Sequence, residues 1–124
     1  MVAGSTGLAP LKAMLEQVAV LPQPPRVYLF FGARNADGLY DLADLEKLAA
    51  EHAWLTVVPV VAAGRFSGLI GSLPEIVASY ASWSEHDAYI AGPTEMVQDT
   101  ASRLAAAGTP AAHIHIEDFG WSEP

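Results

Sequence analysis

Short hydrophobic runs alternate along this chain with segments of helical periodicity. After the first residues, apolar runs rich in β-branched and aromatic residues occupy 27–31, 55–61, 88–91 and 113–116. Such short runs, apolar at successive positions, are typical of parallel strands buried on both faces. Pro59 has no N–H to donate and argues against continued pairing near the end of its run. The pattern predicts four strands after the first residues.

The segments between these runs repeat apolar residues every three or four positions, as one buried face of a helix does. Pro10 suits a first helical turn and precedes such a repeat over 11–18. The same spacing predicts helices over 42–49, 73–80 and 96–104. Alternating strands and helices specify an open parallel sheet with helices on both faces.

The residues before Gly4 are predicted to form a first strand. Together with the four runs above, this gives five strands in one α/β domain over 1–124. The glycine-rich stretch 62–72 is predicted to be a loop. Only three residues precede Gly4, whereas a strand usually has about five or six. Either the chain is a fragment of a longer polypeptide, or upstream residues are missing from the sequence.

Composition narrows the class of protein. Hydrophobic residues make up 52% and charged residues 16%, which argues against disorder and favours a surface partly covered by a partner. The formal net charge of −8 argues against a nucleic-acid partner. No apolar run approaches the ~20 residues of a membrane span, there is no cysteine, and no signal peptide follows Met1. We expect a cytoplasmic protein.

The first candidate site is the loop Gly4-Ser5-Thr6-Gly7 before the first predicted helix. Its glycines allow a sharp turn and close approach to an anion, and the helix amides supply positive potential without lysine. The hydroxyl groups could add hydrogen bonds to phosphate. The loop lacks the third glycine of GxGxxG, however, and an ordinary turn capped by Ser or Thr explains it equally well.

Two further loops are predicted at the same edge of the sheet. The segments Gly32-Ala33-Arg34 and Gly92-Pro93 each follow an apolar run directly. Ligands of open α/β sheets bind outside the carboxyl ends of the strands, so three loops there strengthen a binding site. Arg34 could pair with ribose or phosphate oxygens, or with a nearby carboxylate such as Asp37 or Asp41.

These motifs together resemble the pyridine-nucleotide domain of the ferredoxin-NADP reductase superfamily. The resemblance is closest to its NADH-using branch of flavohaemoglobins and oxygenase reductases. It implies a Rossmann-like NAD-binding domain that follows a flavin-binding barrel, with hydride passing from nicotinamide to FAD. The segments that carry the resemblance are Ala3-Gly4-Ser5-Thr6-Gly7-Leu8-Ala9-Pro10, Phe31-Gly32-Ala33-Arg34 and Ile90-Ala91-Gly92-Pro93 with Met96.

Site roles follow from the resemblance residue by residue. The loop from Gly4 to Gly7 would hold the pyrophosphate, and the segment Gly32-Ala33-Arg34 would lie along the adenosine half. Gly92, Pro93 and Met96 would border the nicotinamide. Phe119 is similar to the aromatic residue that shields the flavin in many members, or it anchors the last strand. Ala91 stands where many members have a cysteine beside the carbon that gives up hydride.

The flavin barrel is absent from these 124 residues, so we expect the isolated chain to be inactive and to need a flavin-binding domain and an unidentified electron acceptor. Arg65 is the only basic residue in the loop after the 55–61 run, which favours NADH over NADPH. The alternative is a non-catalytic module that binds a nucleotide or another protein. His113 and His115 alternate near Glu117, but without an evident third ligand we expect no metal.

Overall fold

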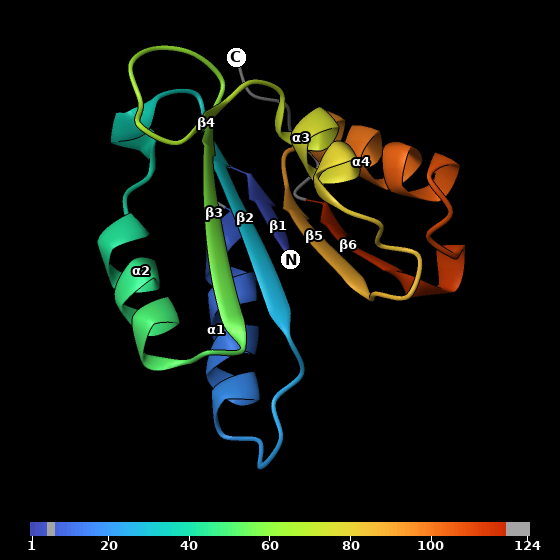
Figure 1. The fold of residues 1–124 in the computed structure, drawn as a ribbon. Coiled ribbons are helices and arrows are strands. Elements are labelled where there is room, and N and C mark those ends of the chain that lie inside the picture. Colours follow the sequence, from blue (N-terminus) through green and yellow to red (C-terminus); the bar gives the residue numbers. More distant parts are fainter. Residues whose placement is uncertain (5–6, 119–124) are drawn as a thin grey trace.

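A six-stranded, all-parallel sheet forms the centre of the computed structural model, which describes residues 1–4 and 7–118 (Figure 1). The strand order is β4-β3-β2-β1-β5-β6. The strands are β1 (Val2–Gly4), β2 (Val27–Ala33), β3 (Leu55–Val61), β4 (Leu69–Ile70), β5 (Ala88–Gly92) and β6 (Ile114–Asp118). The predicted open parallel sheet is confirmed.

Four helices connect the strands and cover both faces of the sheet (Figure 1). The first two pack in one apolar cluster and the last two in the other, so each face has its own pair. The helices are α1 (Leu8–Ala19), α2 (Leu42–Glu51), α3 (Leu73–Tyr80) and α4 (Thr94–Ala106), with short 3-10 turns at Ala36–Gly38 and Ala111–His113. None of the helices in residues 1–4 and 7–118 is both long and apolar enough to cross a membrane.

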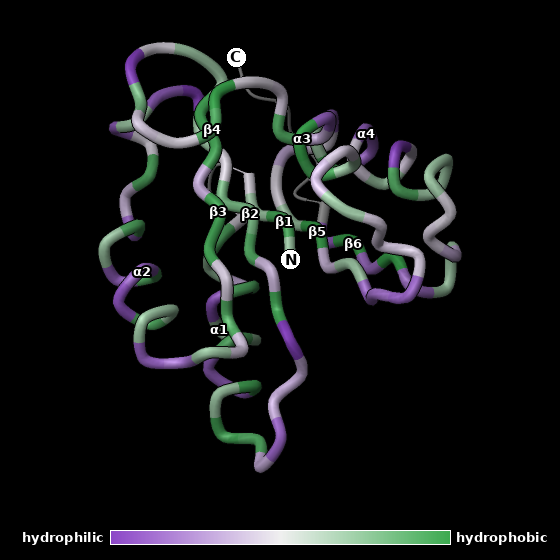
Figure 2. Tube along the Cα trace, in the orientation of Figure 1, coloured by the Kyte–Doolittle hydropathy of each residue, from purple (hydrophilic) through white to green (hydrophobic). Residues whose placement is uncertain are grey.

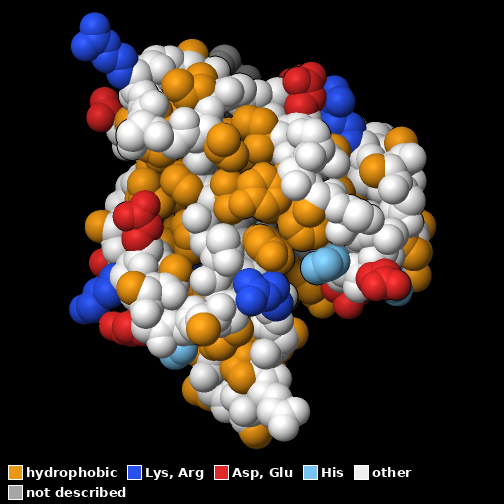
Figure 3. Space-filling model, viewed as in Figure 1, with side chains coloured by type: hydrophobic (Ala, Val, Ile, Leu, Met, Phe, Trp, Pro, Cys, Tyr) orange, Lys and Arg blue, Asp and Glu red, His pale blue; other side chains and the backbone are white. Residues whose placement is uncertain are grey.

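Alternate residues of β2 enter the two hydrophobic clusters. Leu29 and Phe31 pack with α1 and α2, whereas Phe30 packs with α3 and α4. This burial on both faces explains why the strands read as continuous apolar runs, and Figure 2 shows the hydrophobic colour following them. Figure 3 also shows hydrophobic side chains at the surface over β2 and β3, where α3 leaves the sheet partly uncovered.

The sheet has one strand more than the five predicted. The extra strand, β4, lies inside the stretch 62–72 that was predicted to be a loop, and it pairs with the last two residues of β3. The side chains of its residues Leu69 and Ile70 are 40% and 50% exposed. The sequence therefore shows no pattern of buried residues that would predict this strand. The Gly71 N–H donates to the Val61 carbonyl at 2.8 Å and continues this short pairing.

Pro59 lies within β3 without breaking it. The Val27 N–H donates to the Trp54 carbonyl, and the Ala62 N–H donates to the Ala33 carbonyl. The backbone N–H groups along a strand within a sheet point alternately to its two neighbours. The even-numbered residues of β3 therefore bond to β2, and the nitrogen of Pro59 points toward the β4 side. On that side β4 pairs only from Val60 onward, so the missing N–H costs no ladder bond.

Helix α2 is held to the sheet mainly by Leu45, the only fully buried residue of that helix. We expect Leu45→Ala to lower the free energy of unfolding by about 2–4 kcal/mol, because truncation leaves a cavity that α2 cannot fill. Leu48→Ala, at a half-buried position of the same helix, is the matched control and should cost less. Urea unfolding of both variants measures the difference; equal losses would contradict this account of α2.

Candidate functional site

The candidate site lies at the carboxyl ends of β1, β2 and β5. Strand β1 pairs with β2 on one side and with β5 on the other, so the strand order reverses at β1. Gly4 is opposite Gly32, and Ala3 is opposite Ala91. All three predicted loops therefore start at the switch point of the sheet, where open α/β folds bind ligands.

A cavity of about 130 Å³ opens at this edge. Six of the residues singled out in the sequence come together around it, and Ala62 and Leu73 complete the wall. The lining residues are Gly4, Gly32, Ala33, Arg34, Ala62, Leu73, Pro93 and Met96.

The glycines at the strand ends let two apolar side chains approach the backbone. A Cβ atom on Gly4 would lie 2.6 Å from Cε of Met96, and one on Gly32 would lie 2.6 Å from Cδ2 of Leu73. Gly92 adopts φ +150°, which L side chains rarely do, and its Cβ would lie 2.8 Å from the Gly4 carbonyl oxygen. Met96 and Leu73 thus form walls of the cavity because the strand ends have no side chains.

Gly7 has a packing role that its spacing in the sequence does not reveal. A Cβ at this position would collide with the Ala91 carbonyl at the end of β5. Gly7 therefore allows α1 to start in contact with β5, and it does not line the cavity. Pro10, in the first turn of α1, also lies outside the lining.

The amino end of α1 supplies positive potential at this edge. Its first turn holds no acidic residue, and Gly7, the N-cap, makes no side-chain hydrogen bond. By contrast, the first turns of α3 and α4 contain Glu75 and Glu95. The start of α1 therefore carries less negative charge than the starts of α3 and α4, and its backbone N–H groups are better placed to donate to an anion.

Arg34 is exposed at the end of β2 and lines the cavity. Of the two carboxylates proposed as its partners, Asp41 lies beside Lys12, with Nζ and Oδ2 3.5 Å apart. Beside this pair, partial burial and the Asp41 carboxylate raise the pKa of Tyr40 above its ordinary value of 10.0. The cationic side chain at the cavity is consistent with an anionic ligand.

Several predicted residues are not placed at the cavity. Ser5, Thr6 and Phe119 lie outside the described residues. Ala91 is completely buried, and it packs with Ala3 and the α1 residues. The position that many members fill with cysteine therefore faces the hydrophobic core here.

Two cavity residues were missed by sequence reasoning. Ala62 directly follows β3, and this position at a strand end was the available signal. Leu73 was read only as part of a helical repeat, since nothing local shows that its side chain reaches Gly32.

The histidines near the end of the chain make separate contacts. His115 stacks on Tyr89 with ring centroids 4.6 Å apart, and its Nε2 lies 3.3 Å from Oδ1 of Asp87. His113 belongs to the 3-10 turn before β6 and not to the strand. Within 1–4 and 7–118, no three His, Cys, Asp or Glu side chains are grouped as metal ligands.

A larger cavity, of about 490 Å³, lies at the opposite edge of the sheet. The charged side chains of its lining are the two carboxylates of Glu85 and Asp87 and the one guanidinium of Arg26, and Val18 lines it from the carboxyl end of α1. Carboxylates and the negative end of a helix dipole disfavour a pyrophosphate. The smaller cavity at the switch point is therefore the better nucleotide site.

An open parallel sheet with glycine-lined loops and a helix amino end at its switch point defines a dinucleotide-binding α/β domain. The chain belongs to the family of oxidoreductase NAD-binding domains, which matches residues 1–102. The superfamily resemblance stated from the sequence motifs is thereby confirmed.

The chain is similar to reductases of known type. It is 34% identical over 124 residues to the ferredoxin–NAD(P)+ reductase component of the naphthalene 1,2-dioxygenase system of Pseudomonas putida, covering 95% of this chain and 37% of that protein. It is 35% identical over 98 residues to the NAD(P)H-flavin reductase of Aliivibrio fischeri, covering 77% of this chain and 42% of that protein. The crystal structure of the Amycolatopsis cytochrome P450 reductase GcoB matches with a TM-score of 0.82 and 27% identity over 95% of this chain and 36% of its own. The chain thus spans well under half the length of these relatives.

Gly7 provides a test of how the site is built. We expect Gly7→Ala to lower the free energy of unfolding by about 2–3 kcal/mol, because the added methyl forces α1 away from the Ala91 carbonyl. Gly4→Ala meets only the flexible end of Met96 and should cost less than about 1 kcal/mol. Thermal and urea unfolding measure both; a harmless Gly7→Ala would show that the contact does not set the start of α1.

Proposed function

We propose that this chain is the NAD(H)-binding half of a longer flavin-dependent reductase. In that protein it positions the nicotinamide for hydride transfer to an FAD held by a separate flavin-binding domain. The observation that carries the proposal is the cavity at the switch point, where Gly4 at the end of β1, Gly32 near the end of β2 and Pro93 directly after β5 meet. The similarity to a ferredoxin–NAD(P)+ reductase component and to an NAD(P)H-flavin reductase supports it.

The cavity is smaller than the dinucleotide. At about 130 Å³ it falls below the roughly 300–1,000 Å³ of pockets that enclose a drug-sized ligand. In this proposal the adenosine half lies against Ala33 and Arg34, the pyrophosphate at the amino end of α1, and the nicotinamide beside Pro93 and Met96. The remainder of the ligand lies on the open edge of the sheet, where a flavin-binding domain covers it.

Hydride chemistry needs both cofactors, with NADH supplying two electrons as hydride and FAD accepting them. The chain contributes binding and orientation, and Arg34 contributes a positive charge. We expect the isolated chain to be colourless and to give little turnover with added NADH and FAD. The alternative of a module that only binds nucleotide predicts NADH binding that persists without turnover when the flavin-binding domain is attached.

Blocking the cavity tests the site directly. Ala62 is exposed at its rim, so Ala62→Trp should fill the opening without disturbing the core. We expect calorimetric titration to show at least about a tenfold loss of NADH affinity, which corresponds to about 1.4 kcal/mol.

The matched control is Ala63→Trp, at the next residue, which is also exposed but does not line the cavity. This variant should bind NADH like the parent chain. Unchanged binding in Ala62→Trp, or equal losses in both variants, would remove the cavity from the proposed function.

Cofactor preference is proposed to favour NADH. A 2′-phosphate on the adenosine ribose needs positive partners, and Arg65 is the only basic residue in the loop between β3 and β4. We expect the parent chain to bind NADH more tightly than NADPH, and Arg65→Ala to leave that ratio within about twofold, since Arg65 is proposed to make no phosphate contact. Titration with both nucleotides measures the ratio, and an NADPH preference that Arg65→Ala abolishes would overturn the assignment.

A further inference from the structure

Thr100 is a polar residue on a helix face that is otherwise apolar. The buried residues of α4 are Val97, Thr100 and Leu104, which share one face of the helix, and Thr100 is 0% exposed. A buried hydroxyl group loses its hydration and needs a hydrogen-bond partner, whereas a valine of the same shape would not. Packing against the sheet therefore does not by itself account for a threonine at this position.

The hydroxyl group of Thr100 makes two contacts with Met96. Oγ1 donates to the Met96 carbonyl at 2.8 Å, and it lies 3.4 Å from Sδ of the same residue. A bond to the carbonyl one turn earlier is common for threonine in a helix, and it satisfies the donor. The contact with sulfur is additional. Because a thioether is a weak acceptor, this contact orients the Met96 side chain more than it stabilises the fold.

Met96 needs a restraint of this kind to form a fixed wall. Methionine is unbranched and has three rotatable bonds, so its side chain adapts readily to its surroundings. Its methyl group lies between two strand ends, since a Cβ atom on Gly4 would lie 2.6 Å from Cε and one on Gly92 would lie 2.5 Å from it. Thr100 holds the adjacent sulfur from the helix side. Two glycines and one hydroxyl group thus enclose the end of Met96.

The end of Met96 lies where the strand order of the sheet reverses. Gly4 ends β1, Gly92 ends β5, and these two strands are neighbours in the sheet. Met96 also lines the cavity of about 130 Å³ together with Pro93. A rotation of the Met96 side chain would therefore change the surface on which the proposed function places the nicotinamide.

We propose that Thr100 is a positioning residue of the nucleotide site. Its hydroxyl group holds the Met96 side chain against the ends of β1 and β5, and this fixes the surface on which the nicotinamide half of NADH packs. The inference rests on the proposed function and adds to it a residue beneath the site. Since Thr100 is completely buried, it acts only through Met96. The adenosine half, placed against Ala33 and Arg34, does not depend on Thr100.

Two substitutions separate the hydroxyl group of Thr100 from its shape. Thr100→Val keeps the shape and removes the hydroxyl group, whereas Thr100→Ser keeps the hydroxyl group and removes a methyl group. We expect calorimetric titration to show NADH affinity about three- to tenfold lower for Thr100→Val and within about twofold of the parent for Thr100→Ser. Both variants should remain folded, with melting temperatures lower by about 2–6 °C.

A role in packing alone predicts the reverse order. Thr100→Ser leaves a small cavity under α4, whereas Thr100→Val fills the same volume as the parent residue. NADH binding that is unchanged or tighter in Thr100→Val, or weakened equally in both variants, overturns the proposal.

ADP-ribose shows which half of the ligand is affected, because it contains the adenosine and the pyrophosphate but no nicotinamide. We expect Thr100→Val to bind ADP-ribose within about twofold of the parent chain. Equal losses for NADH and ADP-ribose would mean that Thr100 supports the whole edge of the sheet, and they overturn the proposal.

A double-mutant cycle tests whether Thr100 acts through Met96. Met96→Leu removes the sulfur that the hydroxyl group contacts, so Thr100→Val should then change NADH affinity by less than about 1.5-fold. The same fold-loss in both backgrounds would show that Thr100 acts independently of Met96, and it overturns the proposal.

Methyl NMR measures the position of Met96 without any ligand. The chain has three methionines, at positions 1, 14 and 96, so each methyl signal can be assigned by substitution. In the parent and in Thr100→Ser, the Met96 methyl group should show nuclear Overhauser contacts to the Hα atoms of Gly4 and Gly92. In Thr100→Val these contacts should weaken. Equal contacts in all three chains overturn the proposal.

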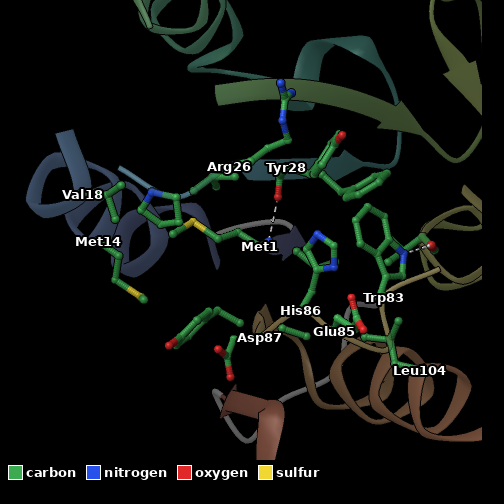
Figure 4. Close-up of a pocket in the computed structure, with 17 residues that line it drawn as sticks. Met1, Met14, Val18, Arg26, Tyr28, Trp83, Glu85, His86, Asp87 and Leu104 are labelled. Atoms are coloured by element: carbon green, nitrogen blue, oxygen red, sulfur yellow. Dashed lines mark hydrogen bonds between the residues drawn. The ribbon is translucent and has the colours of Figure 1, made fainter. Parts of the chain in front are cut away.

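Thr109→Val is the matched control for the loss of a buried hydroxyl group. Thr109 is 3% exposed, and its Oγ1 donates to the Trp83 carbonyl at 3.3 Å. Trp83 lines the larger cavity at the opposite edge of the sheet (Figure 4). Thr109→Val should therefore bind NADH like the parent chain. A loss equal to that of Thr100→Val would show that any buried hydroxyl group has this effect, and it overturns the proposal.

The same titrations separate this inference from the proposed function. A parent chain that binds no NADH overturns the proposed function and, with it, the role of Thr100. A parent chain that binds NADH, with no difference between Thr100→Val and Thr100→Ser, overturns only the role of Thr100.

Discussion

The carbonyl group of Ala91 lies where a side chain at position 7 would have to begin, and this contact joins the start of α1 to the end of β5. Strand β1 lies between β2 and β5, so a single short segment sets the relative position of three strand ends. The amino end of α1, the bare backbone of Gly4 and the wall formed by Met96 follow from that arrangement.

Most of the fold could be predicted because its strands are buried on both faces. A run such as 27–31 can be recognised locally, since every residue in it meets one of the two helix layers. Strand β4 could not be recognised in this way, because its side chains are exposed and two backbone pairings define it. Pro59 was misleading for a similar reason. Whether its missing N–H costs a hydrogen bond depends on where β4 begins to pair with β3.

The edge that carries the candidate site was also predictable, because loops after parallel strands meet at one end of the sheet. The individual contacts of the site could not be predicted from the local sequence. The partner of Gly7 is the carbonyl of Ala91, and Leu73 reaches Gly32 across the sheet; each pair is far apart in the sequence. Glycine spacing therefore located the loop, but it could not separate a glycine needed for packing from one needed for a ligand.

The central place of β1 also has a consequence for the order of folding during synthesis. Val2 is translated before both of its partners, and Phe30 leaves the ribosome well before Ile90. Strands β1, β2 and β3 can therefore assemble with α1 and α2 while one edge of β1 is still unpaired. Closing the sheet with β5 comes late and requires a long-range contact of the kind that slows folding and leaves strand edges open to aggregation.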